Sequence, residues 1–143
     1  MSTEFMVSTG ITFWGSKLNP HELQEIMNLD AKFCGFRVCG EEILRKNGER
    51  TGSYAKTSRL SFNYTDQHPS DKRNPEKQFD FILNHLKNIK GKLDKDFSVD
   101  SAELQLSIYY NEPKKGDVEF FLPKELQSEL VKQNIDIRIT VLP

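Results

Sequence analysis

The sequence lacks a long apolar run. No stretch approaches the roughly 18 uninterrupted apolar residues of a membrane-spanning helix. Its start, Met1-Ser2-Thr3-Glu4, has neither the basic residues nor the apolar region of a signal peptide. These absences predict a cytoplasmic protein that makes no membrane contact.

Cysteine and histidine are scarce. Cys34 and Cys39 are so spaced that on one strand they would point to opposite faces, so we expect free thiols rather than a disulfide. None of His21, His68 and His85 has another histidine four residues away with which it could share a metal ion. The sequence therefore predicts no metal site and no cofactor.

Recognisable catalytic motifs are also missing. The chain has no glycine-rich nucleotide loop, no nucleophile elbow and no zinc-protease motif. Closely spaced carboxylates occur on polar stretches, where solvation is expected rather than the desolvated cleft that acid–base catalysis needs. These carboxylates are Glu41 and Glu42, Glu76 and Asp80, and Glu125 and Glu129. No catalytic residue is predicted.

Neither sign of charge dominates. The 20 Lys and Arg residues nearly cancel the 21 Asp and Glu residues, so no long-range field attracts nucleic acid or an anionic membrane. A content of 36% hydrophobic and 29% charged residues is typical of a globular chain. With 143 residues, the chain has the length of one domain with its own core.

Apolar periodicity predicts strands and helices in alternation. Period-two patterns predict strands over 5–14, 31–38, 60–64, 103–110, 118–122 and 135–141. Helical patterns begin at Pro20, for about two to three turns, and cover 75–93 and 123–131; Asn-Pro pairs begin the first two. A turn at 111–117 predicts a hairpin. The order β-α-β-β-α-β-β-α-β predicts a single α+β domain over 1–143, a two-layer sandwich whose mixed or antiparallel sheet has helices packed on one face.

A polar segment over 40–57 interrupts these patterns. Its Lys46-Asn47-Gly48-Glu49 turn allows either a long hairpin or a mobile loop. Its basic residues can bind phosphate or an acidic protein patch, although interleaved glutamates weaken the field for nucleic acid. The candidate partner-binding residues are Arg45, Lys46, Arg50, Tyr54 and Arg59.

Trp14 is a further candidate. It ends the first strand and is predicted to face away from the side that carries Val7, Ile11 and Phe13. An exposed tryptophan can anchor a partner, whereas packing in the core or at a sheet edge is the alternative role.

The whole chain resembles the bacterial and phage family called domain of unknown function 4279. The resembling segments are Gly10-Ile11-Thr12-Phe13, Asn19-Pro20-His21-Glu22-Leu23, Lys46-Asn47-Gly48-Glu49, the helix from Phe79 to Leu86, and 126–139. The resemblance implies a compact α+β domain of a family without an agreed enzymatic activity. Some small proteins of this general kind are immunity or inhibitor partners of toxins.

Three functions fit these observations. The favoured one is a non-enzymatic protein-binding domain, such as an immunity or inhibitor protein that blocks a partner protein such as a toxin, because mixed charge without a cofactor motif offers surface but little chemistry. A small enzyme with an unrecognised active site is one alternative. A self-associating structural or regulatory subunit is the other.

Overall fold

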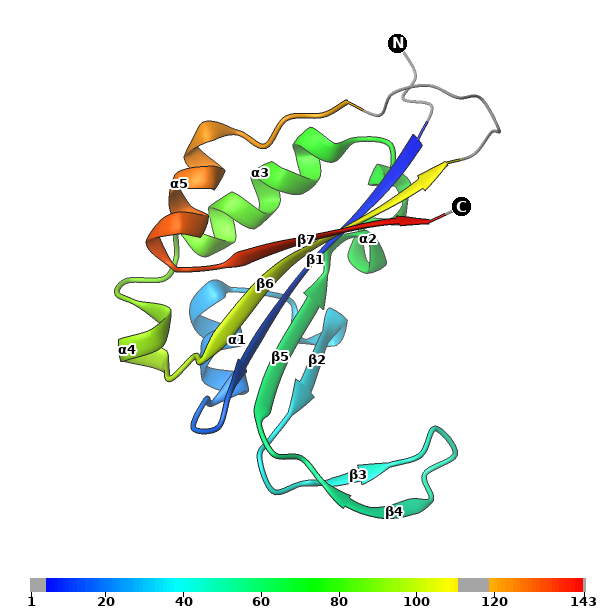
Figure 1. The fold of residues 1–143 in the computed structure, drawn as a ribbon, viewed down its shortest axis with the longest axis vertical. Helices are drawn as coiled ribbons and strands as arrows, with labels where there is room; N and C mark the ends of the chain where they lie inside the picture. The colour runs from blue at the N-terminus through cyan, green and yellow to red at the C-terminus, as the bar shows by residue number, and fades with distance from the viewer. Residues whose placement is uncertain (1–4, 111–118, 143) are drawn as a thin grey trace.

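The computed structural model describes residues 5–110 and 119–142. Its main sheet has the strand order β2-β5-β1-β6-β7, and a separate sheet pairs β3 with β4 (Figure 1). The strands are β1 (Phe5–Gly15), β2 (Cys34–Arg37), β3 (Glu42–Leu44), β4 (Arg50–Tyr54), β5 (Ser58–Asn63), β6 (Ser101–Tyr110) and β7 (Asp136–Leu142). The α-helices are α1 (Pro20–Met27), α2 (Tyr64–Gln67), α3 (Pro75–Leu86), α4 (Leu93–Phe97) and α5 (Lys124–Lys132), and two short 3₁₀ helices are η1 (Ala31–Phe33) and η2 (Pro69–Asp71).

The predicted α+β class with a mixed sheet is confirmed. Central strand β1 pairs antiparallel with β5 on one edge and with β6 on the other. β2 continues the sheet antiparallel to β5, whereas β7 runs parallel to β6. Parallel neighbours need a crossover rather than a tight turn, and α5 lies between β6 and β7 in the sequence.

Alternation along β1 separates a buried face of the sheet from an open one. Val7, Ile11 and Phe13 are fully buried, and their cross-strand partners on β5 and β6 are buried with them. Side chains from α1, α3 and α5 join the same hydrophobic cluster. The three helices therefore form one layer on this face (Figure 1).

Both predicted Asn-Pro helix starts are confirmed. The side chain of Asn19 accepts a hydrogen bond from the backbone N–H of Glu22 (3.2 Å), and that of Asn74 accepts one from Lys77 (3.1 Å). A proline follows each asparagine in the first turn. The cap satisfies a backbone donor without an intrahelical partner, and the proline presets the helical φ angle.

The helix predicted over 75–93 is shorter in the structure. α3 ends at Leu86 and α4 begins at Leu93. Gly91, between them, has a φ of +123°, and a Cβ there would meet a carboxylate of α4. Ile89 and Leu93 remain buried, so the predicted apolar stripe reaches the core from two helices and a turn.

The prediction of a strand over 118–122 is wrong for residues 119–122, the part that the structure describes. Residues 119–122 form no strand, and the predicted turn at 111–117 lies outside the described residues. Phe120 instead packs against the core, with its ring centroid 5.9 Å from that of Phe79 on α3. The apolar residues of this segment therefore serve the helical layer.

Two further strand boundaries shift. Residues 31–33 form η1, whose first turn is capped by the Asp30 carboxylate, so β2 begins only at Cys34. Tyr64, predicted at the end of a strand, instead begins α2 because the Asn63 side chain caps that helix. Short polar side chains that bond to nearby backbone N–H groups compete with strand pairing at both places.

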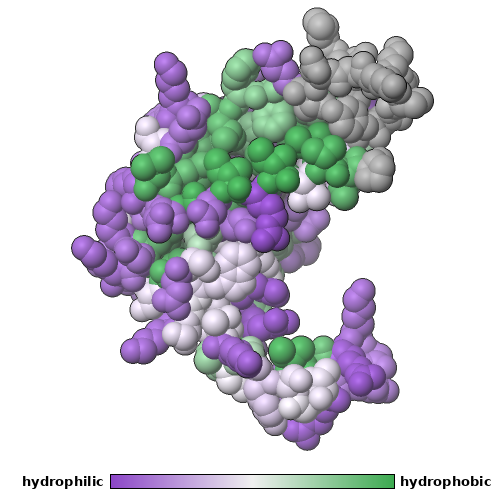
Figure 2. Space-filling view, in the orientation of Figure 1, coloured by the Kyte–Doolittle hydropathy of each residue, from purple (hydrophilic) through white to green (hydrophobic). Residues whose placement is uncertain are grey.

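β7 is much less buried than its apolar alternation predicts. Ile137, Ile139 and Val141 are 43%, 57% and 59% exposed. They lie on the helical side of the sheet, and Figure 2 shows hydrophobic side chains in a row over this strand. Val131 on α5 is 81% exposed. The helical layer of the described residues therefore leaves this sheet edge uncovered.

Residues 40–57, called the arm below, form a hairpin, which is one of the two structures that the sequence allowed for this segment, the other being a mobile loop. β3 and β4 pair antiparallel, and Gly48, with a φ of +85°, lies in the connecting turn. The arm extends away from the main sheet (Figure 1). No helix of the described residues is long and apolar enough to cross a membrane.

The buried stripe of α3 predicts the cost of truncation. Leu83→Ala should lower the free energy of unfolding by roughly 2–5 kcal/mol, because it removes buried methyl groups and leaves a cavity. Val131→Ala, at an exposed position of α5, should change it by less than about 0.5 kcal/mol. Urea titration of both variants measures the difference, and equal effects would contradict the assignment of α3 to the core.

Candidate functional site

The open face of the sheet carries polar and small side chains. On β1 these are Ser8, Gly10 and Thr12, followed on the same face by the large aromatic Trp14, because the alternate residues point into the core. Their cross-strand neighbours on the same face are Arg59, Ser61 and Asn63 on β5, and Ser101, Glu103, Gln105 and Ser107 on β6. Hydroxyl and amide groups therefore dominate the face opposite α1, α3 and α5, and α2 meets this face at Ser8 through Thr65.

Two adjoining pockets lie over this open face, with volumes of about 420 and 570 Å³. Asn63 and Asp66 line both. The first is also lined by Thr12, Gly35, Ser61 and Gln105, and the second by Ser8, Thr65 and Tyr109. A Cβ at residue 35 would lie 2.6 Å from the Ser61 hydroxyl, so glycine lets β2 approach β5 closely here.

Hydrogen bonds hold the lining of both pockets. The Thr12 hydroxyl donates to Gln105 (3.1 Å), which donates to Glu103 (3.0 Å). In the second pocket the hydroxyls of Ser8 and Thr65 are 2.6 Å apart. Interlocked side chains of this kind offer a polar ligand preset donors and acceptors.

Trp14, Arg59 and Arg37 form one row across the open face. The register pairs Trp14 on β1 with Arg59 on β5, and Arg59 with Arg37 on β2. This arrangement brings together two of the predicted site residues and adds Arg37, which the sequence analysis missed. Its only sequence signal was its alternate position in a predicted strand.

The two arginines meet as like charges. Burial lowers the pKa of the Arg59 guanidinium below its ordinary value, and the charge of Arg37 lowers it further. Arginine nevertheless stays protonated at neutral pH, so both positive charges remain. Cross-strand pairs of like charge destabilise a sheet, which makes this pair a local cost to folding.

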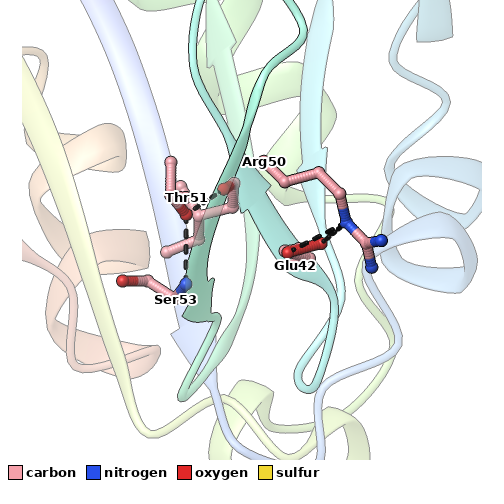
Figure 3. A network of polar contacts seen from close by, with 5 residues as sticks. Glu42, Arg50, Thr51 and Ser53 are labelled. Atoms are coloured by element: carbon pink, nitrogen blue, oxygen red, sulfur yellow. Dashed lines mark hydrogen bonds and ion pairs between the residues drawn. The ribbon is translucent and has the colours of Figure 1, made fainter.

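The other predicted site residues lie apart from this row. Arg45, Lys46, Arg50 and Tyr54 are all exposed on the arm. The Arg50 Nε donates to the Glu42 carboxylate at 2.8 Å (Figure 3). The predicted cluster is therefore split between the arm and the open face.

The arm is braced by its own polar contacts. The Thr51 hydroxyl on β4 donates to the carbonyl of Ile43 on β3 and accepts from the Ser53 backbone N–H (3.1 Å), as Figure 3 shows. At its base, the Cys39 backbone N–H donates to the Ser58 hydroxyl (2.9 Å). An isolated two-stranded hairpin is only marginally stable in water, so these bonds help to keep the arm extended.

Each histidine packs against an aromatic ring, and His68 and His85 share Phe81, at centroid distances of 5.9 and 4.0 Å. His21 stacks on Phe36 at 4.2 Å, and His68 lies over Tyr64 at 4.7 Å. His85 Nδ1 is 2.7 Å from the carbonyl oxygen of a residue on α1. In the part of the chain that the structure describes, no three His, Cys, Asp or Glu side chains are placed to hold a metal ion.

The two thiols are free but differ in environment. Cys34 is partly buried, and this burial, together with the nearby charge of Asp30, raises its pKa to about 11. Its thiol therefore stays protonated at neutral pH and is a poor nucleophile. Cys39 is exposed at the base of the arm.

Fold and site together define an α+β domain with a one-sided helical layer, a polar open face and an extended hairpin arm. The family model described as Domain of unknown function (DUF4279) matches residues 4–142. The chain belongs to this family, which confirms the resemblance of its sequence. No curated protein and no solved structure matched the chain.

The paired arginines predict an unusual stabilising substitution. In phosphate-free buffer of low ionic strength, Arg37→Thr should raise the free energy of unfolding by about 0.5 kcal/mol, because it removes a like charge and keeps a residue suited to a strand. Added salt should shrink the gain. Arg138→Thr is the control and should lower the free energy of unfolding, because Arg138 forms an ion pair with Glu103 at 3.2 Å. Urea titration measures both variants. A lower free energy of unfolding for Arg37→Thr would contradict repulsion between Arg37 and Arg59.

Proposed function

We propose that this protein is a non-enzymatic, cytoplasmic binding domain that blocks a partner protein through its arm, as immunity proteins and inhibitors of toxins do. The observation that carries the proposal is the extension of the arm from the main sheet with large side chains exposed. A projecting hairpin can enter a cleft of another protein that a flat sheet face cannot reach.

The composition of the arm suits a protein interface. Tyr54 is 57% exposed and Leu44 is 55% exposed, and Figure 2 shows hydrophobic surface on the arm beside hydrophilic surface. Tyrosine and arginine are enriched among residues that dominate binding energy, because each combines a large contact area with directed hydrogen bonding. The arm thus combines an aromatic anchor with cations in one small element.

Charge and rigidity support the same role. Arg50 is held by Glu42, whereas Arg45 and Lys46 near the tip form no ion pair with a described residue. Exposed cations steer association with an acidic partner surface. Internal bracing of the arm lowers the ordering cost on binding.

A second candidate function is self-association through β7, because its exposed Ile137, Ile139 and Val141 lie on an open sheet edge. Long apolar edges promote strand pairing unless they are covered. An antiparallel pairing of two copies centred on Ile139 would place Ile137 opposite Val141 of the second copy. Each exposed aliphatic side chain would then face another one.

The arm proposal predicts a selective loss of binding. Tyr54→Ala combined with Arg45→Ala should weaken partner affinity by roughly tenfold or more and leave the melting temperature unchanged, because both residues are exposed. Affinity capture from the native host with quantitative mass spectrometry identifies the partner, and calorimetry with purified proteins measures the affinity.

The matched control is Phe121→Ala combined with Lys124→Ala, which removes an exposed aromatic residue and a cation away from the arm. This variant should bind as the wild type does. Equal affinity of the arm variant and the wild type would exclude the arm as the interface.

The second candidate makes a separate prediction. Sedimentation of the wild type at micromolar concentration should show a dimer, and Ile139→Lys should give a monomer, because a buried unpaired ammonium group opposes strand pairing. Phe121→Lys, at an exposed site outside the sheet, should stay dimeric. A wild-type monomer at every concentration tested would remove self-association as a function.

A further inference from the structure

Arg37 and Arg59 form an uncompensated pair of positive charges on the open face. They are direct partners across β2 and β5, where opposing Cβ atoms lie about 5 Å apart. Among the described residues, none forms an ion pair or hydrogen bond with either side chain. Glu103, on the same face, is already engaged by Arg138.

The Arg59 side chain also has a buried donor that is not used. Its Nε atom is buried and has no hydrogen-bond partner among the described residues. Buried donors in folded proteins are almost always paired, so an unpaired one calls for a specific explanation. A surface arginine that merely packs its aliphatic stem would keep its guanidinium in water. Burial of this one nitrogen distinguishes Arg59 from an arginine whose whole guanidinium group lies in water.

The surroundings of the pair suit a small ligand. Gly35 and Ser61 lie two residues further along β2 and β5 on the same face, about 7 Å away, and line the pocket of about 420 Å³. Trp14 lies on the other side of Arg59. Asp66, the acidic residue of this pocket, follows the far end of β5, away from Arg59. Lys32, a further cation, also lines this pocket, together with apolar Phe33 and Phe62. The arginines thus lie beyond one end of a mixed pocket in which Gly35, Ser61 and Thr12 form a polar stretch.

We propose that Arg37 and Arg59 bind the phosphate group of a small phosphorylated ligand, whose polar remainder lies over Gly35, Ser61 and Thr12 in the adjoining pocket. Two guanidinium groups carry a charge of +2, which matches the charge of about −1.5 to −2 on a phosphate monoester at neutral pH. Guanidinium forks also donate paired hydrogen bonds to phosphate oxygens. A single carboxylate would leave one charge uncompensated.

This site is distinct from the proposed partner-binding arm, although it lies at the arm's base. β2 ends at Arg37 just before the arm begins, and β5 starts at Ser58 just after the arm ends. A bound phosphate would remove the repulsion between the arginines and stabilise the strands from which the arm extends. The two sites can be tested separately because Arg45 and Lys46 belong only to the arm.

The test is titration with inorganic phosphate, monitored by the fluorescence of Trp14, the protein's single tryptophan. A parallel titration follows the arginine Nε–H resonances by NMR. We expect saturable changes in both signals and a rising melting temperature at millimolar phosphate. Acetate at equal ionic strength, which probes a carboxylate, should bind more weakly by roughly tenfold.

The decisive variant is Arg37→Gln combined with Arg59→Gln, and its matched control is Arg45→Gln combined with Lys46→Gln, which removes the same charge from the arm. Phosphate affinity should fall by roughly tenfold or more in the first and stay unchanged in the second. If the first variant does not fold, Arg37→Gln alone carries the comparison. Absence of both signals in the wild type, equal affinity in the variant or equal binding of acetate would overturn the proposal. Failure of phosphate binding would leave the proposal for the arm standing, because that proposal is tested by the affinity of the arm variants for the partner protein.

Discussion

Pairing of β1 along both of its edges organises this domain. Because β5 and β6 both align with it, the alternation of its side chains assigns the faces of all its neighbours. Val7, Ile11 and Phe13 direct one face to the helices, and Ser8 and Trp14, both partly exposed, belong to the other. A shift of one residue would bury the hydroxyls and expose the core.

A buried polar link positions the helical layer against this strand. Gln78 on α3 is fully buried and accepts a hydrogen bond from the Thr9 hydroxyl (2.6 Å). Its amide nitrogen donates to the carbonyls of Val7 and Asp71 (both 2.8 Å). Removing any one partner would leave a buried group unpaired, which costs about 1–3 kcal/mol. The link therefore sets the register of α3 on β1 more specifically than apolar contacts alone, and with it the boundary of the open face.

Three surface features depart from what stability alone would favour. The arm extends large side chains into solvent, β7 leaves aliphatic residues on an open edge, and Arg37 faces Arg59 across two strands. Each has a cost that the buried core must offset, and local conflicts of this kind tend to occur where a protein binds something. The arm and the paired arginines are joined at the same strand ends. Binding at one of them would therefore change the stability of β2 and β5, the strands next to the other.

Features that depend on near neighbours in the chain follow from the amino-acid sequence alone. Alternation defined β1 and β6, Asn-Pro pairs started α1 and α3, and the turn at Gly48 allowed the hairpin. Which surfaces are covered and which distant residues meet depends on the tertiary fold. It left the aliphatic residues of β7 exposed, separated Arg59 from the arm, and placed it between Trp14 and Arg37. The physical reason is that strand order and register depend on long-range packing, whereas caps, turns and periodicity act within a few residues of chain.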